Sequence, residues 1–330
     1  MESNKDYIKI DNVSMWYPVK SGVKLFAKEK QWVKAVDKVS LEMGKGEVLG
    51  VIGESGCGKS TTGKMIVKLL EPTEGSIRFR GKDVFKTQGE ESKLLRKEVQ
   101  IIFQDPYSSL DPRFTVGRTI SEPLVVHKIG DEKTRKERAI KLMNDVGLMG
   151  EYFDRYPHEF SGGQRQRIGV ARALALNPSL IVCDEPVSAL DVSIQAQILN
   201  LMQELQAKYH LTYLFISHNL SVVKHICDRI AVMYLGKIVE IANKKDLFDN
   251  PKHPYTQALL SAIPIPDPEI IVEQEMLEGD VPSPVDPPSG CRFHTRCKNV
   301  MDICKKQEPK DLNMGEDHIV ACHLYDNKED

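Results

Sequence analysis

The stretch VLGVIGESGCGKSTTGKMIVKLL, Val48–Leu70, joins an apolar run to a glycine-rich loop and then to a helical pattern. Within it, Gly53–Ser60 fits the spacing G-x-x-x-x-G-K-[ST] of a phosphate-binding loop. Glycines let backbone amides turn toward a phosphate, and the positive end of the following helix points at the same anion. Lys59 adds a full positive charge, and the Ser60 hydroxyl is suited to ligate Mg²⁺. A plain flexible turn is the alternative, but the buried strand before the loop and the helix after it favour a phosphate site.

Two further apolar runs end in polar side chains that such a loop requires. Ser179–Glu185 ends in Asp184, a carboxylate suited to Mg²⁺, and in Glu185, which would face the γ-phosphate. Hydrolysis needs a base or a water-orienting group at that place. Leu211–His218 ends in His218, which either contacts the γ-phosphate or is a structural cap. We therefore expect these side chains to meet the phosphate loop.

The order of the patterns predicts an α/β fold. Short alternating strand patterns occur near the start, at residues 8–19 and 33–43, and residues 105–176 are mostly helical. An amphipathic helical pattern, residues 193–209, lies between the two later apolar strands. Strand–helix–strand alternation is typical of a doubly wound sheet, in which ligands collect at the carboxyl ends of the strands.

Composition limits the class of protein. The chain has 330 residues, 41% of them hydrophobic and 28% charged, with a net charge of −2, as in a soluble globular protein. That charge gives no overall field for binding nucleic acid. The mixed-charge run 131–141 is interpreted as a solvated helix face. We find neither a signal peptide nor an apolar run of about 18–20 residues, so we expect a cytosolic chain that reaches a membrane only by docking onto a membrane-spanning partner.

A second helix start also carries phosphate-binding features. In FSGGQRQRIGVARALAL, residues 160–176, Ser161-Gly162-Gly163 precedes a helical pattern and offers hydroxyl and amide donors. One chain thus has one phosphate loop but two helix N-termini that are suited to bind an anion. We expect two chains to pair head to tail, each nucleotide lying between the loop of one chain and the Ser-Gly-Gly of the other. A simple helix cap is the alternative.

Five motifs together resemble those of an ATP-binding cassette (ABC) ATPase. GESGCGKST, IFQDPYSSLDP, FSGGQRQR, LIVCDEPVSALD and FISH occur in the order and spacing of that family, over roughly residues 7–250. The resemblance implies a P-loop NTPase cassette: a RecA-like core, an antiparallel β subdomain and a helical subdomain at about 105–176. It also implies ATP and Mg²⁺ as ligands, and ATP hydrolysis as the activity.

The resemblance implies roles for matching residues. Catalytic roles fall to Glu185, His218 and Gln104, and Mg²⁺ would be held by Ser60, Gln104 and Asp184. The signature that contacts the ATP of the opposite chain consists of Ser161, Gly162, Gly163 and Gln164. Asp191 is the implied D-loop residue at the dimer interface. The implied ATP-binding residues are Tyr17, Gly53, Glu54, Ser55, Gly56, Cys57, Gly58, Lys59, Ser60 and Thr61, with Trp16 as a rival to Tyr17 for stacking on adenine.

Within the family, YPVKSG, QDPYSSLDPRFTVG and HPYTQALLSAIP resemble the ATPase subunits of oligopeptide/dipeptide importers, especially the F-type subunit. This implies a peripheral protein at the cytoplasmic face of the membrane. Its implied partners are a second ABC ATPase subunit, two transmembrane permease subunits and, indirectly, an extracytoplasmic substrate-binding protein. Nickel or sugar-type cargo is an alternative. A soluble ABC ATPase of translation or DNA repair is disfavoured, because the chain has one cassette and no heptad run between Lys59 and Asp184.

The end of the chain differs in character, which predicts domains at 1–250 and 251–330. Residues 251–288 hold nine of the 18 prolines and are interpreted as an extended linker. Cys291, Cys297, Cys304 and Cys322 follow, with a spacing that matches neither common zinc nor ferredoxin patterns. The resemblance implies a [4Fe–4S] cluster on these four cysteines, with zinc as the alternative. The bound group would stabilise a small C-terminal domain. The remaining cysteines are expected in the loop or core.

Overall fold

The main sheet has a parallel half that positions the polar strand ends. A computed structural model describes residues 7–19, 31–105, 107–262, 279–315 and 317–326. Its eight-stranded sheet has the order β11-β12-β10-β9-β3-β8-β7-β6, and the strands from β9 to β6 pair in parallel. Their carboxyl ends therefore share one edge. These parallel strands are β3 (Val48–Ile52), β6 (Val99–Ile102), β7 (Leu180–Asp184), β8 (Thr212–Ile216) and β9 (Arg229–Tyr234).

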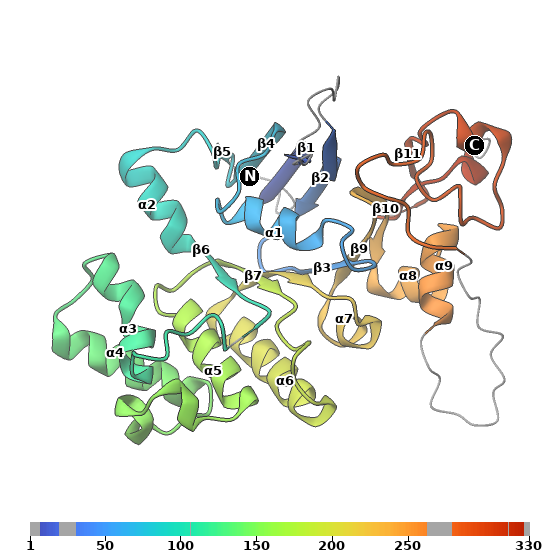
Figure 1. The fold of residues 1–330 in the computed structure, drawn as a ribbon. Helices are drawn as coiled ribbons and strands as arrows, with labels where there is room; N and C mark the ends of the chain where they lie inside the picture. The colour runs from blue at the N-terminus through green and yellow to red at the C-terminus, as the bar shows by residue number, and fades with distance from the viewer. Residues whose placement is uncertain (1–6, 20–30, 106, 263–278, 316, 327–330) are drawn as a thin grey trace, which may run out of the picture.

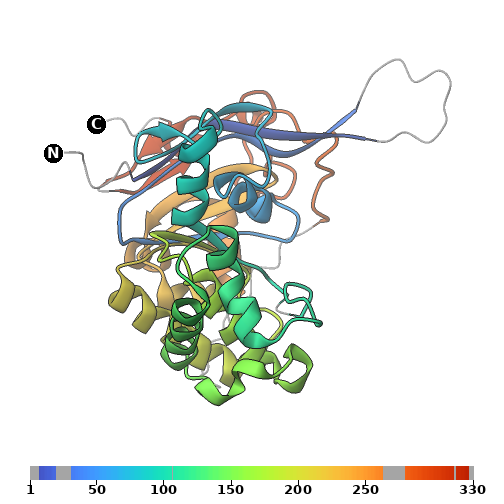
Figure 2. The same ribbon diagram turned by 90° about the vertical axis from the view of Figure 1, so that its left-hand side faces the viewer.

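A smaller antiparallel sheet covers one face of the main sheet (Figure 1). It has the order β2-β1-β4-β5, and Figure 2 shows its longest strands projecting past the neighbouring elements. Helix α1 (Lys59–Ile66) packs between the two sheets, and α2 (Gly89–Glu98) leads into β6. The strands are β1 (Ile8–Pro18), β2 (Trp32–Met43), β4 (Glu74–Phe79) and β5 (Lys82–Asp83).

Helices cover the opposite face of the main sheet (Figure 1). Short 3₁₀ turns at Gly150–Asp154 and Pro157–Glu159 connect two of them. The mixed-charge run predicted as a helix face forms most of α4, and the amphipathic pattern forms α6. The helices are α3 (Val116–Val126), α4 (Glu132–Asp145), α5 (Gly162–Ala173), α6 (Val192–Tyr209) and α7 (Leu220–Ile226). None of the helices in the described ranges combines the length and the hydropathy needed to cross a bilayer.

Strand periodicity divides the core into two layers. In β3, Val48 and Ile52 face the helical layer, whereas Leu49 and Val51 face α1 and the smaller sheet. Successive side chains of a strand point to opposite faces, and both faces of this strand are buried. The continuous apolar run before the phosphate loop follows from that double burial.

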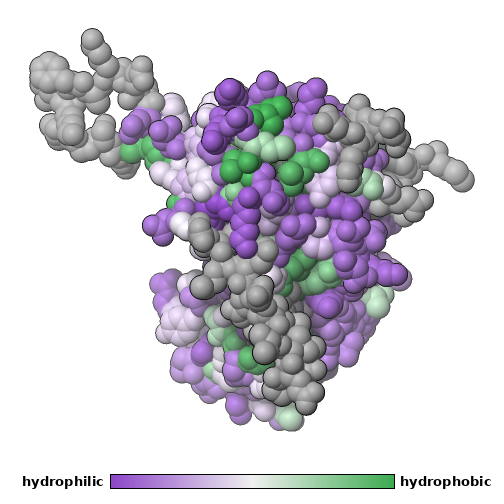
Figure 3. Space-filling view, turned by 90° about the vertical axis from the view of Figure 1, so that its right-hand side faces the viewer, coloured by the Kyte–Doolittle hydropathy of each residue, from purple (hydrophilic) through white to green (hydrophobic). Residues whose placement is uncertain are grey.

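The C-terminal segment is built onto the main sheet. Strand β10 (Lys237–Asn243) pairs with β12 (Ile319–Ala321), and β12 pairs with β11 (Asp311–Asn313), all antiparallel. The side chain of Phe293 is buried in the same core as the helical layer. The sequence did not predict β11 and β12, since each has only three residues. Figure 3 shows this side of the molecule as mainly hydrophilic, with small separate hydrophobic areas.

The predicted linker is only partly extended. After α8 (Lys244–Asp249), the chain forms α9 (Pro254–Ser261) inside the proline-rich stretch. Pro254 is the first residue of the helix, where its missing amide hydrogen costs nothing, so this proline starts a helix. Residues 263–278 of the predicted linker lie outside the described residues.

The start of α9 makes stability depend on pH. His253 is buried, and its Nδ1 accepts a hydrogen bond from Tyr255 N at 3.0 Å. Burial lowers the pKa of His253 to about 4, against the opposing effect of Glu240. Above pH 6.5 the histidine is neutral in both folded and unfolded chains. Between pH 6.5 and 4 only the unfolded chain takes up the proton, so the free energy of unfolding falls by about 3 kcal/mol as the pH drops.

We expect His253→Asn to flatten that pH dependence, because asparagine keeps a capping acceptor and does not titrate. Urea denaturation at pH 7 and at pH 4.5 gives the change in the free energy of unfolding between the two pH values, which is compared between wild type and variant. The exposed His210, at a left-handed helix end that asparagine tolerates, gives the control His210→Asn. An equally steep loss of stability in His253→Asn would contradict the prediction.

Candidate active site

The phosphate loop connects the carboxyl end of β3 to α1. Lys59 is buried, and its Nζ donates hydrogen bonds to Gly53 O at 2.8 Å and Glu54 O at 2.9 Å, which fold the loop around the ammonium group. The loop forms one wall of a cavity of about 480 Å³. Its lining residues are Ala35, Ser55, Gly56, Gly58, Lys59, Ser60, Thr61, Gln104, Glu185 and His218. Predicted residues from four separate segments thus meet at one cavity, and Ala35 of β2 adds a residue that the motifs did not indicate.

Ser60 and Asp184 form the part of the site suited to a cation. The Ser60 hydroxyl donates to Asp184 Oδ1 at 2.6 Å, and Asp184 is buried at the end of β7. Burial raises the pKa of Asp184, while the Ser60 hydrogen bond and nearby lysines oppose the shift. These hard oxygen donors, with the Gln104 side chain on the same cavity, fit Mg²⁺, which takes few protein ligands and keeps waters.

Glu185 is the centre of a second group. Its Oε2 accepts a hydrogen bond from Gln104 Nε2 at 2.9 Å and lies 3.1 Å from His218 Nδ1. Gln104 follows β6 and His218 follows β8, on either side of β7. Glu185 has a φ of 49°, a left-handed backbone conformation that is uncommon outside glycine and is concentrated at functional sites. That conformation turns the carboxylate into the cavity, and no sequence pattern indicated it.

The predicted signature lies away from this cavity. Ser161 caps α5: its hydroxyl accepts from Gln164 N at 3.3 Å, and Ser161 N donates to Gln164 Oε1 at 3.0 Å. A Cβ on Gly163 would come within 2.5 Å of Ile194 Cγ2, so the glycine permits close packing of α5 on α6. Asp191 caps α6 and accepts from Ile194 N at 3.0 Å. Neither Ser161 nor Asp191 lines the cavity of its own chain, and both are exposed.

Several predicted binding residues turn their side chains elsewhere. Tyr17 lies on β1 opposite Val33 and does not line the cavity, and the neighbouring Trp16 has Lys34 Nζ 5.9 Å from its ring centroid. Within the loop, the Cys57 side chain packs into the core between the sheets. Glu54 points to the C-terminal segment, where it pairs with Arg296, a contact that no sequence motif indicated.

Gly58 is a loop position where an added side chain would clash with the backbone of β2. Its φ is 107°, and a Cβ there would lie 2.3 Å from Ala35 O. We expect Gly58→Ala to lower the free energy of unfolding by about 3 kcal/mol, through strain and a clash with backbone. Gly56→Ala is the matched control, because Gly56 also has a positive φ, 79°, but nothing within 4 Å of its added Cβ. Urea denaturation without nucleotide compares them, and equal losses would refute the role of the clash.

The four-cysteine prediction is wrong. Within the described ranges, no group of three or more His, Cys, Asp and Glu side chains could hold a metal ion, so neither an iron–sulfur cluster nor zinc is supported. Cys304 and Cys322 are buried, and Cys291 and Cys297 pack against the main core. Burial raises the pKa of Cys291 to about 11 and of Cys322 to about 12, so without a metal ion both thiols are neutral near pH 7. The Mg²⁺ prediction is separate, since its donors include Ser60 and Gln104.

Two protein families match the chain. Residues 36–188 match the family described as ABC transporter, and residues 239–304 match the oligopeptide/dipeptide transporter C-terminal region. The oligopeptide transport ATP-binding protein AppF of Bacillus subtilis is 53% identical over 321 residues, covering 96% of this chain and 97% of AppF. The dipeptide transport ATP-binding protein DppF of Haemophilus influenzae is 46% identical, covering 99% of each chain. These relatives are named as ATP-binding proteins, none as an iron–sulfur protein.

Solved structures agree with the fold. The dimeric ATP-binding cassette MJ0796 bound to ADP and Pi has a TM-score of 0.62 and 28% identity, covering 72% of this chain and 98% of that one. The cbiO1 protein of Clostridium perfringens, part of an ABC transporter complex, has a TM-score of 0.63 and 25% identity, covering 74% and 92%. The predicted P-loop NTPase cassette fold is therefore confirmed. The chain belongs to the ABC family of ATPases and, within it, to the ATP-binding proteins of oligopeptide and dipeptide transporters.

Proposed function

We propose that this chain is the ATP-hydrolysing subunit that powers import of dipeptides or oligopeptides through a membrane ABC transporter. The observation that carries the proposal is the convergence of Lys59, Ser60, Gln104 and Glu185 on one cavity. The similarity to AppF and DppF along nearly the whole chain supports peptides as cargo over nickel or sugars. As an importer subunit the protein associates with the membrane through permease subunits, at the cytoplasmic face.

In this proposal the phosphate loop binds the triphosphate. Lys59 and the amides of Ser55–Thr61 neutralise and orient the β- and γ-phosphates. Ser60, Asp184 and Gln104 would hold Mg²⁺, which would supply positive charge for the phosphate oxygens. The Ser60–Asp184 hydrogen bond supports this assignment, because it already places the two oxygens together. Tyr17, or Trp16 beside it, would stack on adenine at the outer end of the site.

Glu185 is proposed as the base. Its carboxylate would accept a proton from the water that attacks the γ-phosphorus, because it is the acidic side chain on the cavity wall opposite the loop. Gln104 orients Glu185 through the 2.9 Å hydrogen bond, and His218 lies beside the same carboxylate oxygen and would contact the γ-phosphate. The three side chains come from the ends of β6, β7 and β8.

A second ABC ATPase subunit completes the site. The signature Ser161–Gln164 does not reach the cavity of its own chain, and neither does Asp191. Ser161 and Asp191 are exposed, which supports their contact with the nucleotide and surface of a partner chain. We propose a complex of two ATPase subunits and two permeases, supplied by an extracytoplasmic binding protein. We also propose that residues 1–250 form the ATPase domain and residues 251–330 a C-terminal domain packed on it.

Reconstitution tests this function. The tagged chain is purified from detergent-solubilised membranes with its permeases, placed in lipid vesicles, and assayed for ATP-dependent uptake of a labelled dipeptide and a labelled pentapeptide, with ⁶³Ni²⁺ as the competing cargo. We expect peptide uptake that stops when ATP is omitted. Nickel uptake without peptide uptake would overturn the cargo assignment, and purification with ribosomes instead of permeases would overturn the transport function.

A further inference from the structure

The C-terminal segment contacts the phosphate loop through a partly buried ion pair. Arg296 donates from Nη1 to Glu54 Oε2 at 2.8 Å and from Nη2 to Glu54 Oε1 at 3.1 Å, a two-pronged guanidinium–carboxylate pair. Only 6% of the Arg296 side chain is exposed. The hydrogen bond to Glu54 raises the pKa of Arg296, so the guanidinium remains charged. The second residue of the loop is therefore fixed from outside the motif that contains it.

The same residue is held through its backbone. Glu54 N donates to Tyr255 Oη at 2.9 Å, and Tyr255 belongs to α9, also C-terminal to the cassette motifs. The Tyr255 ring packs 5.3 Å from Phe293 and 4.7 Å from Tyr234, measured between ring centroids. This aromatic cluster joins α9, β9 and the cysteine-containing segment, and it sets the position of the Tyr255 hydroxyl.

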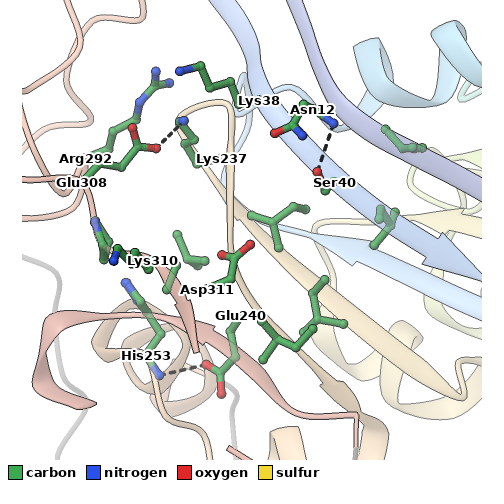
Figure 4. A pocket seen from close by; sticks show the side chains of 18 of the residues that line it. Asn12, Lys38, Ser40, Lys237, Glu240, His253, Arg292, Glu308, Lys310 and Asp311 are labelled. Atoms are coloured by element: carbon green, nitrogen blue, oxygen red, sulfur yellow. Dashed lines mark hydrogen bonds and ion pairs between the residues drawn. The ribbon is translucent and has the colours of Figure 1, made fainter. Parts of the chain in front are cut away.

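A second arginine secures the other side of the loop. Arg292 is buried and donates to Asp37 Oδ2 and to Leu235 O, at the turn after β9. In that turn Gly236 N donates to Cys57 O of the loop at 2.9 Å. Arg292 also lines a cavity of about 700 Å³ between the smaller sheet and the C-terminal segment, where Lys237 pairs with Glu308 (Figure 4). The segment thus contacts the surroundings of the loop at two separate places.

The Glu54 contact reaches the nucleotide site through Lys59. The Lys59 ammonium donates to Glu54 O, so a displaced Glu54 takes with it one of the two carbonyls that aim this lysine. An unpaired Glu54 carboxylate would also leave a negative charge on the loop that binds the triphosphate. Arg296 removes both problems, since it fixes the residue and neutralises its charge.

We propose that Arg296 is a positioning residue for ATP: through Glu54 it fixes the start of the phosphate loop and the direction of Lys59, so that tight nucleotide binding depends on the C-terminal segment. This inference rests on the proposed ATPase function and adds to it a role for residues 279–326. Arg296 does not itself touch the cavity, so its effect is on the affinity for nucleotide more than on the chemical step.

Substitution of Arg296 in the full chain tests the proposal. Titration calorimetry with the non-hydrolysable analogue AMP-PNP and Mg²⁺ should show about tenfold weaker binding for Arg296→Gln, because the displaced Glu54 no longer positions Lys59. Arg296→Lys keeps the positive charge but cannot make both hydrogen bonds to Glu54. Its affinity for AMP-PNP should lie between those of wild type and Arg296→Gln. In the transporter complex, KM for ATP should rise about tenfold with kcat changed less than threefold. Lys305→Gln is the control, because Lys305 is exposed in the same segment and its side chain pairs with Asp302, a residue outside the phosphate loop.

Glu54→Gln separates positioning from simple charge neutralisation. Positioning predicts weaker AMP-PNP binding in this variant too, and a double variant no weaker than Arg296→Gln alone, because both changes break one contact. Tighter or unchanged binding in Glu54→Gln would overturn the proposal, as would wild-type affinity in Arg296→Gln. If wild type itself fails to bind AMP-PNP, the ATPase function fails first, and the two failures are thereby distinguished.

Discussion

Replacing Glu185 with glutamine should reduce ATP turnover by about a thousandfold and leave ATP binding intact. Glutamine has the same shape, but its amide cannot accept the proton of the attacking water, and loss of a general base costs about 10²–10⁴ in rate. The Glu185 carboxylate contacts Gln104 and His218, whereas Lys59 and Ser60 bond to other groups, so the phosphate contacts survive. Unhydrolysed ATP should then hold two chains together through the signature.

Two measurements check the expectation. Phosphate release is measured in the transporter complex, and size-exclusion chromatography with ATP and Mg²⁺ reports dimer formation by the chain. Glu137→Gln, at an exposed position of α4, removes the same charge far from the cavity and should match wild type. A Glu185→Gln chain that hydrolyses ATP at the wild-type rate and stays monomeric would refute both the base and the composite site.

The edge of the site could be predicted from sequence because each of its residues follows a local pattern. An apolar run indicates a buried strand, and the carboxyl ends of parallel strands lie at one edge of the sheet. Asp184, Glu185 and His218, which end such runs, were therefore expected near the phosphate loop. The sequence pattern did not predict the backbone conformation of Glu185. A positive φ at a glutamate has no sequence signature of its own, since it is imposed by the loop that packs around it.

The C-terminal segment could not be predicted in this way, because its contacts are non-local. Glu54 and Arg296 are 242 positions apart, and neither belongs to a pattern that names the other. Strands β11 and β12 are too short to show a period and form only because β10 offers them an edge. The cysteine prediction, which came from the resemblance, failed for a related reason. A resemblance in motifs gives no information on how the four side chains lie in this chain, and here Cys291 and Cys297 pack against the main core.

Lys59→Met should abolish measurable ATP binding, with a loss of affinity of at least about a hundredfold, or roughly 2.7 kcal/mol. Lys59 is the buried cation of the cavity wall formed by the loop, and a triphosphate placed there without it would be poorly neutralised in surroundings that screen charge weakly. Methionine fills a similar volume, so the loop keeps its packing and only the charge and its hydrogen bonds are lost. The effect should exceed that of Arg296→Gln, because Arg296 acts only through the position of this ammonium group.

Thermal unfolding with and without ATP and Mg²⁺ measures the loss as the disappearance of the ligand-induced rise in melting temperature, which reports binding to the folded chain alone. Lys45→Met is the control, because Lys45 is exposed in the turn between β2 and β3 and should keep the full rise. Unchanged melting of Lys59→Met without nucleotide would show that the fold is intact. A full ATP-induced rise in that variant would mean that the nucleotide binds elsewhere, since no arrangement of the loop amides alone replaces a buried charge facing the phosphates.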